Sequence, residues 1–461
     1  MDFQEQLRLL NKRKAELFGE KAVTPEGTAR LYGALFDEGT FVELNALAAQ
    51  GGCVTGYGLV DDLPAYLIAQ DDQVDGGAMS QAQAKRITNA IDKAMTVAAP
   101  VVLVINSQGA KVTEGAAVLH AYTEVFTRLQ MMDGLSPRIA VINGPCVGVA
   151  AHFAALCDIS IAVDGKAQLL SAPTSVLEAV HGAAKDSKTW GSASVLAQQG
   201  AVALAASDTA AALKTVRELL LLLPSSVYSE PVRDVKDDMN RLLTDSAMEN
   251  GLKLAKMVAD KHSLMELYPT YGAGAHVALA RLDGEPCGIV STEFTVDEGR
   301  LDAASCDKIA RFVMLCQSFE LPVITLINSK SLAVPKPQDQ AWLMRASTDM
   351  MRAYHDAVHT RLAVIAGDAI GTAYAAFGGK WMADTVFAWP ASVIAPLSKE
   401  VAVQTFDADA LKTKDRSELE AAYAASADGF AAAALGIVDE VIDPAQTRKY
   451  LISALQMHLT A

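Results

Sequence analysis

The sequence of 461 residues lacks several features that mark common classes of protein. None of its six cysteines belongs to a Cys-x-x-Cys pair, so we expect no zinc ribbon and no other metal site. No apolar run approaches the roughly 20 residues that span a membrane, because the run Leu219–Leu223 stops at Pro224. No P-loop is present, so ATP chemistry has to come from a partner chain. The cysteines stand in apolar or helical contexts, which indicates buried free thiols in a reducing cytosol.

Basic side chains are also in short supply. The 39 Lys and Arg residues face 54 Asp and Glu residues, giving a net charge of −15 at pH 7. This balance argues against broad binding to nucleic acid or to an anionic membrane, although a local basic patch for a phosphorylated small ligand remains compatible with it. Residues 1–23 have a helical period and acidic side chains, so we expect no signal peptide and a cytoplasmic protein.

What the sequence does contain is an internal duplication. The stretch Ile139–Phe153, IAVINGPCVGVAAHF, returns as Leu362–Phe377, LAVIAGDAIGTAYAAF. Upstream, Ala99–Ser107 matches Leu321–Ser329, and both segments end in Ile-Asn-Ser. Because Val/Ile runs alternate with Ala-rich helical patterns in both halves, we predict two similar α/β domains in tandem. Pro224–Val232 is the most linker-like passage, which predicts domains of residues 1–232 and 233–461.

Each repeat predicts a buried strand, a glycine turn and a helix start. In the first copy the strand is expected over Ile139–Ile142, with the turn built on Gly144 and Pro145 and a second glycine at Gly148. Such a turn directs backbone N–H groups into a cleft, where they bind phosphate or stabilise an oxyanion. The same glycines also fit a purely structural role, in which they let a helix pack close to a strand. Cys146 lies on this turn, but no triad-type grouping surrounds it, so we interpret it as a buried thiol.

Other segments have clear local signals. We predict helices over residues 1–38, an N-cap at Ser80, a long helix over Glu114–Met132 and a hairpin across Asp283-Gly284. The pattern of Met239–Leu267 also predicts helix.

Several motifs together are far more specific than one glycine loop. They are Leu35–Leu44, Gly76–Ser80, Gln108–Gly115, Gly144–Gly148, Val216–Leu219, Ala280–Val290, Asp307–Val313 and Ala388–Pro390. In these motifs the chain resembles the carboxyltransferase (beta) subunit of biotin-dependent acyl-CoA carboxylases, of the propionyl-CoA carboxylase type, and the related subunit of acyl-CoA decarboxylases. The resemblance implies two crotonase-type (ClpP/crotonase-like) domains, a homohexamer, and active sites between the N-domain of one subunit and the C-domain of another. It implies as partners a biotin carboxyl carrier protein and either a biotin carboxylase or a membrane decarboxylase subunit.

The resemblance also implies the reaction and its donors. A carboxyl group moves between carboxybiotin and the α-carbon of a short acyl-CoA through an enolate, so two oxyanions need aimed backbone N–H groups. The implied thioester hole consists of the N–H groups of Gly148 and Val149, with the loop that holds Gly109 and Ala110 beside it. The implied biotin hole consists of the N–H groups of Thr372 and Ala373. No side chain is the general base, since a nitrogen of biotin takes the α-proton.

Further residues are implied to bind the cofactors. On the biotin side these are Gly371 and Tyr374, although Tyr374 also fits a core role. On the coenzyme A side they are Gly76, Gly77, Lys85 and Lys111; the two lysines, with Arg86, are candidates for phosphate contacts, whereas surface lysines are usually only solvated. His152 follows the first hole, where a histidine is more often structural than catalytic.

The chain departs from the family pattern around both holes. Gln108, Val149 and Thr372 replace glycines, Ala375 replaces an aspartate, and Asn328–Leu332 replaces a Thr-Pro-Gly-Phe loop. The backbone donors persist only where the new residues keep a negative φ. These departures leave two alternatives to a carboxylase: the carboxyltransferase component of a sodium-pumping decarboxylase, and a catalytically weak scaffold beside an active paralogue. A CoA-thioester hydrolase or hydratase is disfavoured because such enzymes need only one domain.

Overall fold

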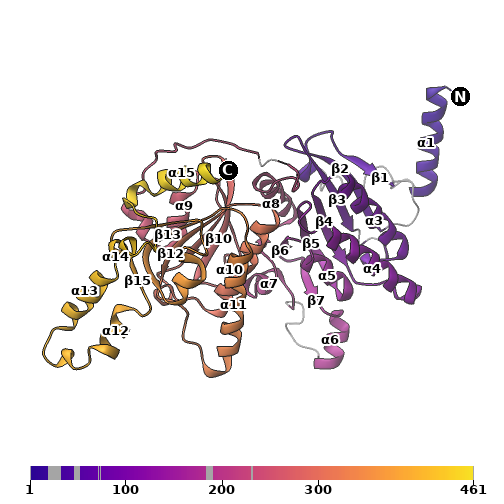
Figure 1. Ribbon diagram of the computed structural model, residues 1–461. Helices are drawn as coiled ribbons and strands as arrows, with labels where there is room; N and C mark the ends of the chain where they lie inside the picture. Colours follow the sequence, from indigo (N-terminus) through magenta and orange to yellow (C-terminus); the bar gives the residue numbers. More distant parts are fainter. Residues whose placement is uncertain are drawn as a thin grey trace. The chain divides into compact units, whose positions relative to one another are not determined.

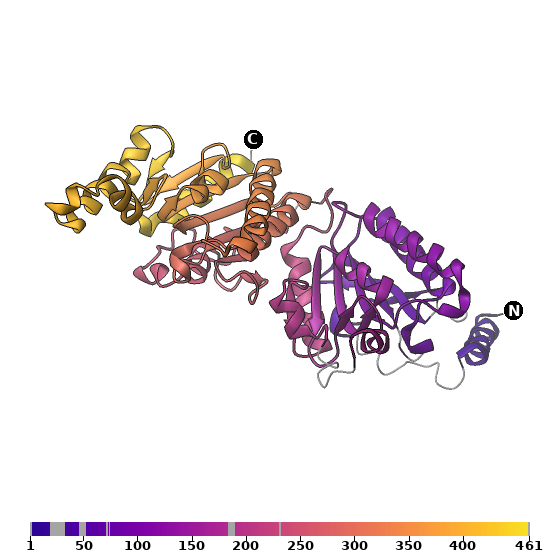
Figure 2. The same cartoon turned by 90° about the horizontal axis from the view of Figure 1, so that it is seen from below.

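The protein is described by a computed structural model over residues 2–18, 33–45, 52–70, 72, 74–182, 190–229 and 232–459. The chain divides into two compact units, residues 1–230 and 231–461. Each contains an eight-stranded mixed sheet with its own apolar core. Figures 1 and 2 show the strands and helices of each unit from two directions. The prediction of two similar α/β domains in tandem is therefore confirmed. None of the helices in the described ranges is long and apolar enough to cross a membrane.

The first unit has the strand order β1-β2-β3-β4-β5-β6-β8, and β7 pairs with the far end of β5. The first three strands are antiparallel, and the pairs from β3 onward are parallel. The strands are β1 (Val42–Leu44), β2 (Cys53–Val60), β3 (Leu63–Gln70), β4 (Val101–Ser107), β5 (Arg138–Val147), β6 (Ile159–Val163), β7 (Gln168–Leu170) and β8 (Leu204–Ala206). The α-helices are α1 (Phe3–Phe18), α3 (Gln81–Thr96), α4 (Ala116–Met131), α5 (Ala151–Ala155), α6 (Thr174–His181), α7 (Ala193–Gln198) and α8 (Thr209–Leu222).

The second unit repeats this plan, in the order β9-β10-β11-β12-β13-β14-β16 with β15 on β13. Its strands are β9 (Met265–Leu267), β10 (Ala275–Leu282), β11 (Glu285–Thr292), β12 (Val323–Ser329), β13 (Arg361–Ile370), β14 (Thr385–Ala388), β15 (Val393–Ala395) and β16 (Glu440–Val441). Its α-helices are α9 (Gly251–Val258), α10 (Ala303–Ser318), α11 (Gln340–Asp356), α12 (Lys399–Phe406), α13 (Arg416–Ser426), α14 (Gly429–Ala434) and α15 (Thr447–Leu459).

The central strands and their helices form for the same reasons in both units. β4 and β12 are buried along almost their whole length, which is typical of parallel strands covered on both faces. The helix that precedes each strand has a side-chain cap: Ser80 accepts from the Gln83 N–H at 3.1 Å, and Asp302 accepts from the Ser305 N–H at 2.8 Å. The N-cap predicted at Ser80 is confirmed, as is the hairpin between β10 and β11.

Three local predictions need correction or restriction. The predicted strand Ile139–Ile142 does not end at a Gly144-Pro145 turn, because β5 continues to Val147 and changes its partner from β6 to β7. For residues 1–38, helix α1 is confirmed, and residues 19–32 lie outside the described ranges.

The predicted helix over Met239–Leu267 is also wrong. It contains α9, one short 3₁₀ turn over Asp245–Met248, and strand β9. Arg241 donates to the main-chain oxygens of Met257 and Ala259, so the segment before α9 folds back on the end of that helix. These tertiary hydrogen bonds override a local helical pattern.

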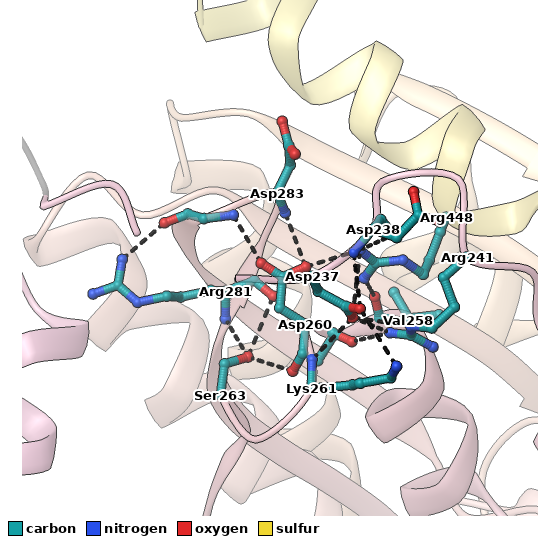
Figure 3. Close-up of polar contacts among 12 residues, drawn as sticks. Asp237, Asp238, Arg241, Val258, Asp260, Lys261, Ser263, Arg281, Asp283 and Arg448 are labelled. Carbon is teal, nitrogen blue, oxygen red and sulfur yellow. Dashed lines mark hydrogen bonds and ion pairs between the residues drawn. The ribbon is translucent and has the colours of Figure 1, made fainter. Parts of the chain in front are cut away.

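A buried ionic network fastens the last described helix to the second sheet. Figure 3 shows Arg448, on α15, pointing toward Asp260. Arg448 is fully buried and donates to Val258 O at 2.6 Å and to Asp260 Oδ1 at 2.9 Å. The same carboxylate accepts from the N–H groups of Asp283 and Gly284, at 3.1 and 2.8 Å, in the turn between β10 and β11. One side chain thus holds a helix, a loop and a hairpin turn together.

Candidate active site

In each unit a central strand leads into a left-handed glycine and then a helical turn. β5 leads to Gly148, whose φ is +63°, and β13 leads to Gly371, whose φ is +52°. The residues that follow, Val149 and Thr372, do not have positive φ values. The side chains that replace glycine at these two positions are therefore accommodated without left-handed strain, and the N–H groups lie at the start of a helical turn.

In each unit a second glycine lets the strand, β5 or β13, come close to the Asn-Ser pair that ends the neighbouring strand, β4 or β12. A Cβ at Gly144 would lie 2.1 Å from Asn106 Oδ1, and one at Gly367 would lie 2.4 Å from Asn328 Cγ. Only glycine permits this contact. It places the ends of β4 and β12 beside the turns described above, where each ladder also shifts its register.

The loop after the Asn-Ser end is also the same in the two units. In the first, Met79 N–H donates to Gly109 O at 2.8 Å, and Lys111 N–H donates to Met79 O at 2.9 Å. In the second, Leu301 N–H donates to Ser331 O at 3.0 Å, and Ala333 N–H donates to Leu301 O at 2.9 Å. Ser331 therefore occupies the position of Gly109.

The turn of the first unit faces a cavity of about 420 Å³. It is lined by Gly148, Val149, Ala151, His152, Leu169, Leu170 and Ser171. No side chain of the described residues accepts from the Val149 N–H, so this donor is available to a ligand. Of the other predicted residues of the first site, Gly109 lies beside this turn, since a Cβ on it would lie 3.2 Å from Val147 O, and Ala110 bridges to Met79.

A second, apolar cavity of about 690 Å³ adjoins the first through His152. Phe126, Thr127, Gln130 and Met131 of α4 line one side, and Ala155 and Leu156 the other. The His152 ring also meets Phe126 edge-on at 6.2 Å between centroids. This histidine thus lines both the cavity at the backbone donors and the apolar cavity beside α4.

The predicted coenzyme A residues are only partly brought to this cavity. Gly77 lies against Asn106, where a Cβ would be 2.1 Å from the main-chain oxygen, and Gly76 lies beside Gln108. Lys111 is paired with Asp75 at 2.6 Å, and this hydrogen bond raises the pKa of the lysine.

Lys85 lies elsewhere in the first unit. It lines a groove of about 830 Å³ between α3 and α4, together with Arg86 and Arg128. None of the residues lining the 420 Å³ cavity takes part in this groove.

The turn of the second unit differs at its donor. The Thr372 N–H donates to Ser331 Oγ at 3.1 Å, and Ser331 has a φ of +82°. Gly371 N–H donates to Ala395 O at 2.9 Å, and Ala373 is buried. Tyr374 donates its hydroxyl to Ile437 O at 3.0 Å, which gives the ring a structural role as well.

Charged side chains lie near this second turn, and the sequence analysis did not predict them. Lys330 Nζ lies 2.5 Å from Glu298 Oε2 and 3.2 Å from Glu400 Oε1. Lys330 lowers the pKa of Glu298 through their hydrogen bond. Nearby, burial raises the pKa of Asp368. The repeat is the one feature of the sequence that could have pointed to this cluster, because it aligns Glu298 with Gly76, a residue predicted to lie at the first site.

Cys146 does not offer a nucleophile. Its thiol is fully buried, donates to Ala150 O at 3.4 Å, and burial raises its pKa to about 12. A thiol that keeps its proton at neutral pH is inert. Across the described residues, no group of three or more metal-ligating side chains is present.

Residues 30–461 match the family described as the carboxyl transferase domain. The chain belongs to this family. Among similar proteins, the methylmalonyl-CoA decarboxylase subunit alpha of Propionigenium modestum is 31% identical, with 92% of this chain and 88% of the relative covered. The mitochondrial propionyl-CoA carboxylase beta chain of Mus musculus is 32% identical, with 88% and 76% covered.

A solved structure supports the same assignment. The transcarboxylase 12S hexamer, crystallised with methylmalonyl-coenzyme A and methylmalonic acid, aligns with a TM-score of 0.90 at 26% identity, over all of this chain and 96% of that one. The predicted pair of tandem crotonase-type domains is confirmed. This carboxyltransferase therefore belongs with the biotin-dependent acyl-CoA carboxylases and decarboxylases.

Proposed function

We propose that this carboxyltransferase moves a carboxyl group between carboxybiotin, held on a partner carrier protein, and the α-carbon of a short acyl-CoA. The first unit would bind the acyl-CoA and the second the biotin. The observation that carries the proposal is the turn of the first unit, where the Val149 N–H faces a cavity of about 420 Å³. The names of the relatives and the ligands of the transcarboxylase support a substrate of the methylmalonyl-CoA and propionyl-CoA class.

The first unit would act by stabilising charge. An enolate forms when the bond to the α-carboxyl group breaks or, in the carboxylating direction, when the α-proton leaves, and in both cases the thioester oxygen becomes negative. The N–H groups at Gly148 and Val149 lie at the start of a helical turn, where the partial positive charge favours an anion. Most of the residues that line this cavity are small or apolar, which lowers the local dielectric and strengthens the interaction.

The biotin site is expected at the second turn, where the residues suit a neutral urea oxygen. Ser331 offers a hydroxyl, to which the Thr372 N–H donates, and the nearby charges of Lys330 and Glu298 are paired with each other. Bound carboxybiotin supplies the carboxyl group and, once that has left, a ring nitrogen that takes the α-proton. The chain itself needs only to hold and orient the two ligands.

The partners and assembly follow as proposals from the same family. They are a biotin carboxyl carrier protein together with a biotin carboxylase or a membrane decarboxylase subunit, and a homohexamer like that of the transcarboxylase. The soluble step is the same in both directions, so a copurifying membrane subunit would identify the decarboxylating arrangement.

The proposal is tested by transfer of carboxyl from methylmalonyl-CoA or malonyl-CoA to free biotin. We expect turnover with one of these thioesters and a loss of about 10²–10³ in rate for Gly148→Pro, because proline cannot adopt the left-handed turn that aims the donors. Gly165→Pro is the matched control, since Gly165 has a φ of +67° and open space around it, away from the donors. Equal losses in both variants would contradict the assigned role of the turn.

One observation favours a different function. Because the Thr372 N–H is already bonded to Ser331, the second site is less open than the first, as expected of a scaffold subunit beside an active paralogue. A folded, oligomeric sample that transfers nothing from a panel of carboxylated CoA esters would favour the scaffold.

A further inference from the structure

Ser331 is a serine in a conformation that serines avoid. Its φ of +82° lies in the left-handed region, where an L-residue has a steric conflict between Cβ and the carbonyl oxygen. The equivalent residue of the first unit is Gly109, with a φ of +102°. A strained residue at a ligand site persists when its side chain has a task there.

The side chain of Ser331 points at the predicted biotin donors. Its Oγ accepts from the Thr372 N–H at 3.1 Å and would lie 3.2 Å from a Cβ built on Gly371. A hydroxyl has one proton to donate besides the lone pairs that accept. Among the described residues no acceptor takes that proton, and Ser331 is only half-buried.

From this geometry we propose that the Ser331 hydroxyl is the hydrogen-bond donor that the second unit presents to the urea oxygen of biotin. This inference rests on the proposed function. The Thr372 N–H polarises the hydroxyl by donating to it, and the hydroxyl passes its own proton toward the ligand, so the two bonds strengthen each other. The Ser331 hydroxyl then lies between the Thr372 N–H and the urea oxygen, whereas in a site made only of backbone amides the oxygen would contact the N–H directly.

The alternative is that Ser331 merely blocks the Thr372 N–H. The two possibilities predict opposite effects of removing the hydroxyl. If it donates to the ligand, its loss weakens the biotin half of the reaction. If it blocks the amide, its loss improves that half.

The experiment measures carboxyl transfer to free biotin and, separately, equilibrium binding of free biotin and of a CoA thioester. Ser331→Ala removes only the hydroxyl and keeps Cβ, whereas Ser331→Gly also removes the strain. We expect both variants to lose about 10²-fold in transfer rate and to bind biotin at least several-fold more weakly, with the KM for the CoA ester unchanged. Ser331→Cys, a weaker donor, should fall between them and the wild type.

Each other outcome overturns the inference. Faster transfer or tighter biotin binding in Ser331→Ala and Ser331→Gly would show a block. If the KM for the CoA ester rises by the same factor as biotin binding weakens, Ser331 has only a structural role. Wild-type protein that binds the CoA ester but not biotin would overturn this inference and leave the acyl-CoA half of the proposed function standing. Protein that binds neither would overturn both.

Discussion

The two turns have the same backbone and different surroundings. In the first unit the Val149 N–H is open to a cavity, and the position opposite it is Gly109. In the second unit the equivalent Thr372 N–H is bonded to Ser331, and an ion cluster centred on Lys330 stands beside it. The two copies thus share a way of presenting an amide and differ in the side chains around it.

A smaller difference follows from one proline. Asn328 Oδ1 accepts from the Asp368 N–H at 3.0 Å. The equivalent oxygen of Asn106 is buried with no partner, because the equivalent residue is Pro145, which has no N–H. The first site therefore carries an unsatisfied acceptor that the second does not.

The largest expected effect comes from making the first turn resemble the second. In Gly109→Ser we expect the new hydroxyl to meet the Val149 N–H and displace the thioester oxygen, lowering transfer by about 10²-fold or more. The measurement is kcat/KM for the CoA ester at saturating free biotin.

The control for this variant is Gly109→Ala, which adds a Cβ 3.2 Å from Val147 O and no hydroxyl. It should lose less than the serine variant. If alanine and serine cost the same, the hydroxyl has no specific effect.

The next effect concerns equivalent ion pairs at the starts of β5 and β13, the strands that lead to the two turns. Arg138 and Asp158 pair at 2.5 Å with side chains 4% and 6% exposed, whereas Arg361 and Asp384 pair at 3.1 Å with side chains 16% and 32% exposed. Asp158→Asn removes one of the two carboxylates that pair with the buried guanidinium and leaves Asp133, so we expect a loss of about 1.5–3 kcal/mol in the free energy of unfolding.

Asp384→Asn should cost only about 1 kcal/mol or less, because its pair is partly solvated. Urea denaturation of both variants measures the difference. Similar losses would mean that burial does not separate the two pairs.

The unsatisfied acceptor provides a third test. Asn328→Ala leaves the Asp368 N–H without its acceptor, which we expect to cost about 1–3 kcal/mol. Asn106→Ala removes an oxygen that had no partner, so its loss in the free energy of unfolding should be smaller than that of Asn328→Ala by about 1–3 kcal/mol. Thermal unfolding of the two variants under one condition compares them, and a larger loss in Asn106→Ala would contradict the role given to Pro145.

The smallest effect is a pH dependence confined to the second unit. Burial raises the pKa of Asp368, so the folded protein holds a proton that the unfolded chain has released, and stability falls as pH rises above the ordinary carboxyl pKa. The asparagine in Asp368→Asn cannot ionise and keeps the backbone N–H, so the stability of this variant should no longer fall over this pH range. Unfolding followed from pH 4 to pH 7 would show parallel curves if the carboxyl had no such influence.

The sequence was sufficient for the architecture and for the glycine turns at Gly148 and Gly371, but it placed a turn at Gly144-Pro145 where β5 continues to Val147. The close approach at Gly144 and the left-handed φ at Gly148 both require glycine, and glycine is visible in the sequence. The Ile-Asn-Ser segment is visible there as a repeat. The Ser331 contact was not predictable, because a serine has no sequence signature for a left-handed φ. Glu298, Lys330 and Glu400 come from three separate segments that only the fold brings together. Lys85 stays a predicted phosphate contact, and its place in the groove between α3 and α4 could not be read from the sequence because it depends on how these helices pack.

The network around Arg448 has a consequence for how the protein is made. The second sheet needs a side chain from α15 to neutralise Asp260 beneath the turn at Asp283. During synthesis this helix leaves the ribosome after every strand of that sheet, so the second unit reaches its full stability only once α15 has emerged. Chains cut short before α15 would keep an unpaired buried carboxylate, which marks them for removal by the proteases that act on unstable proteins.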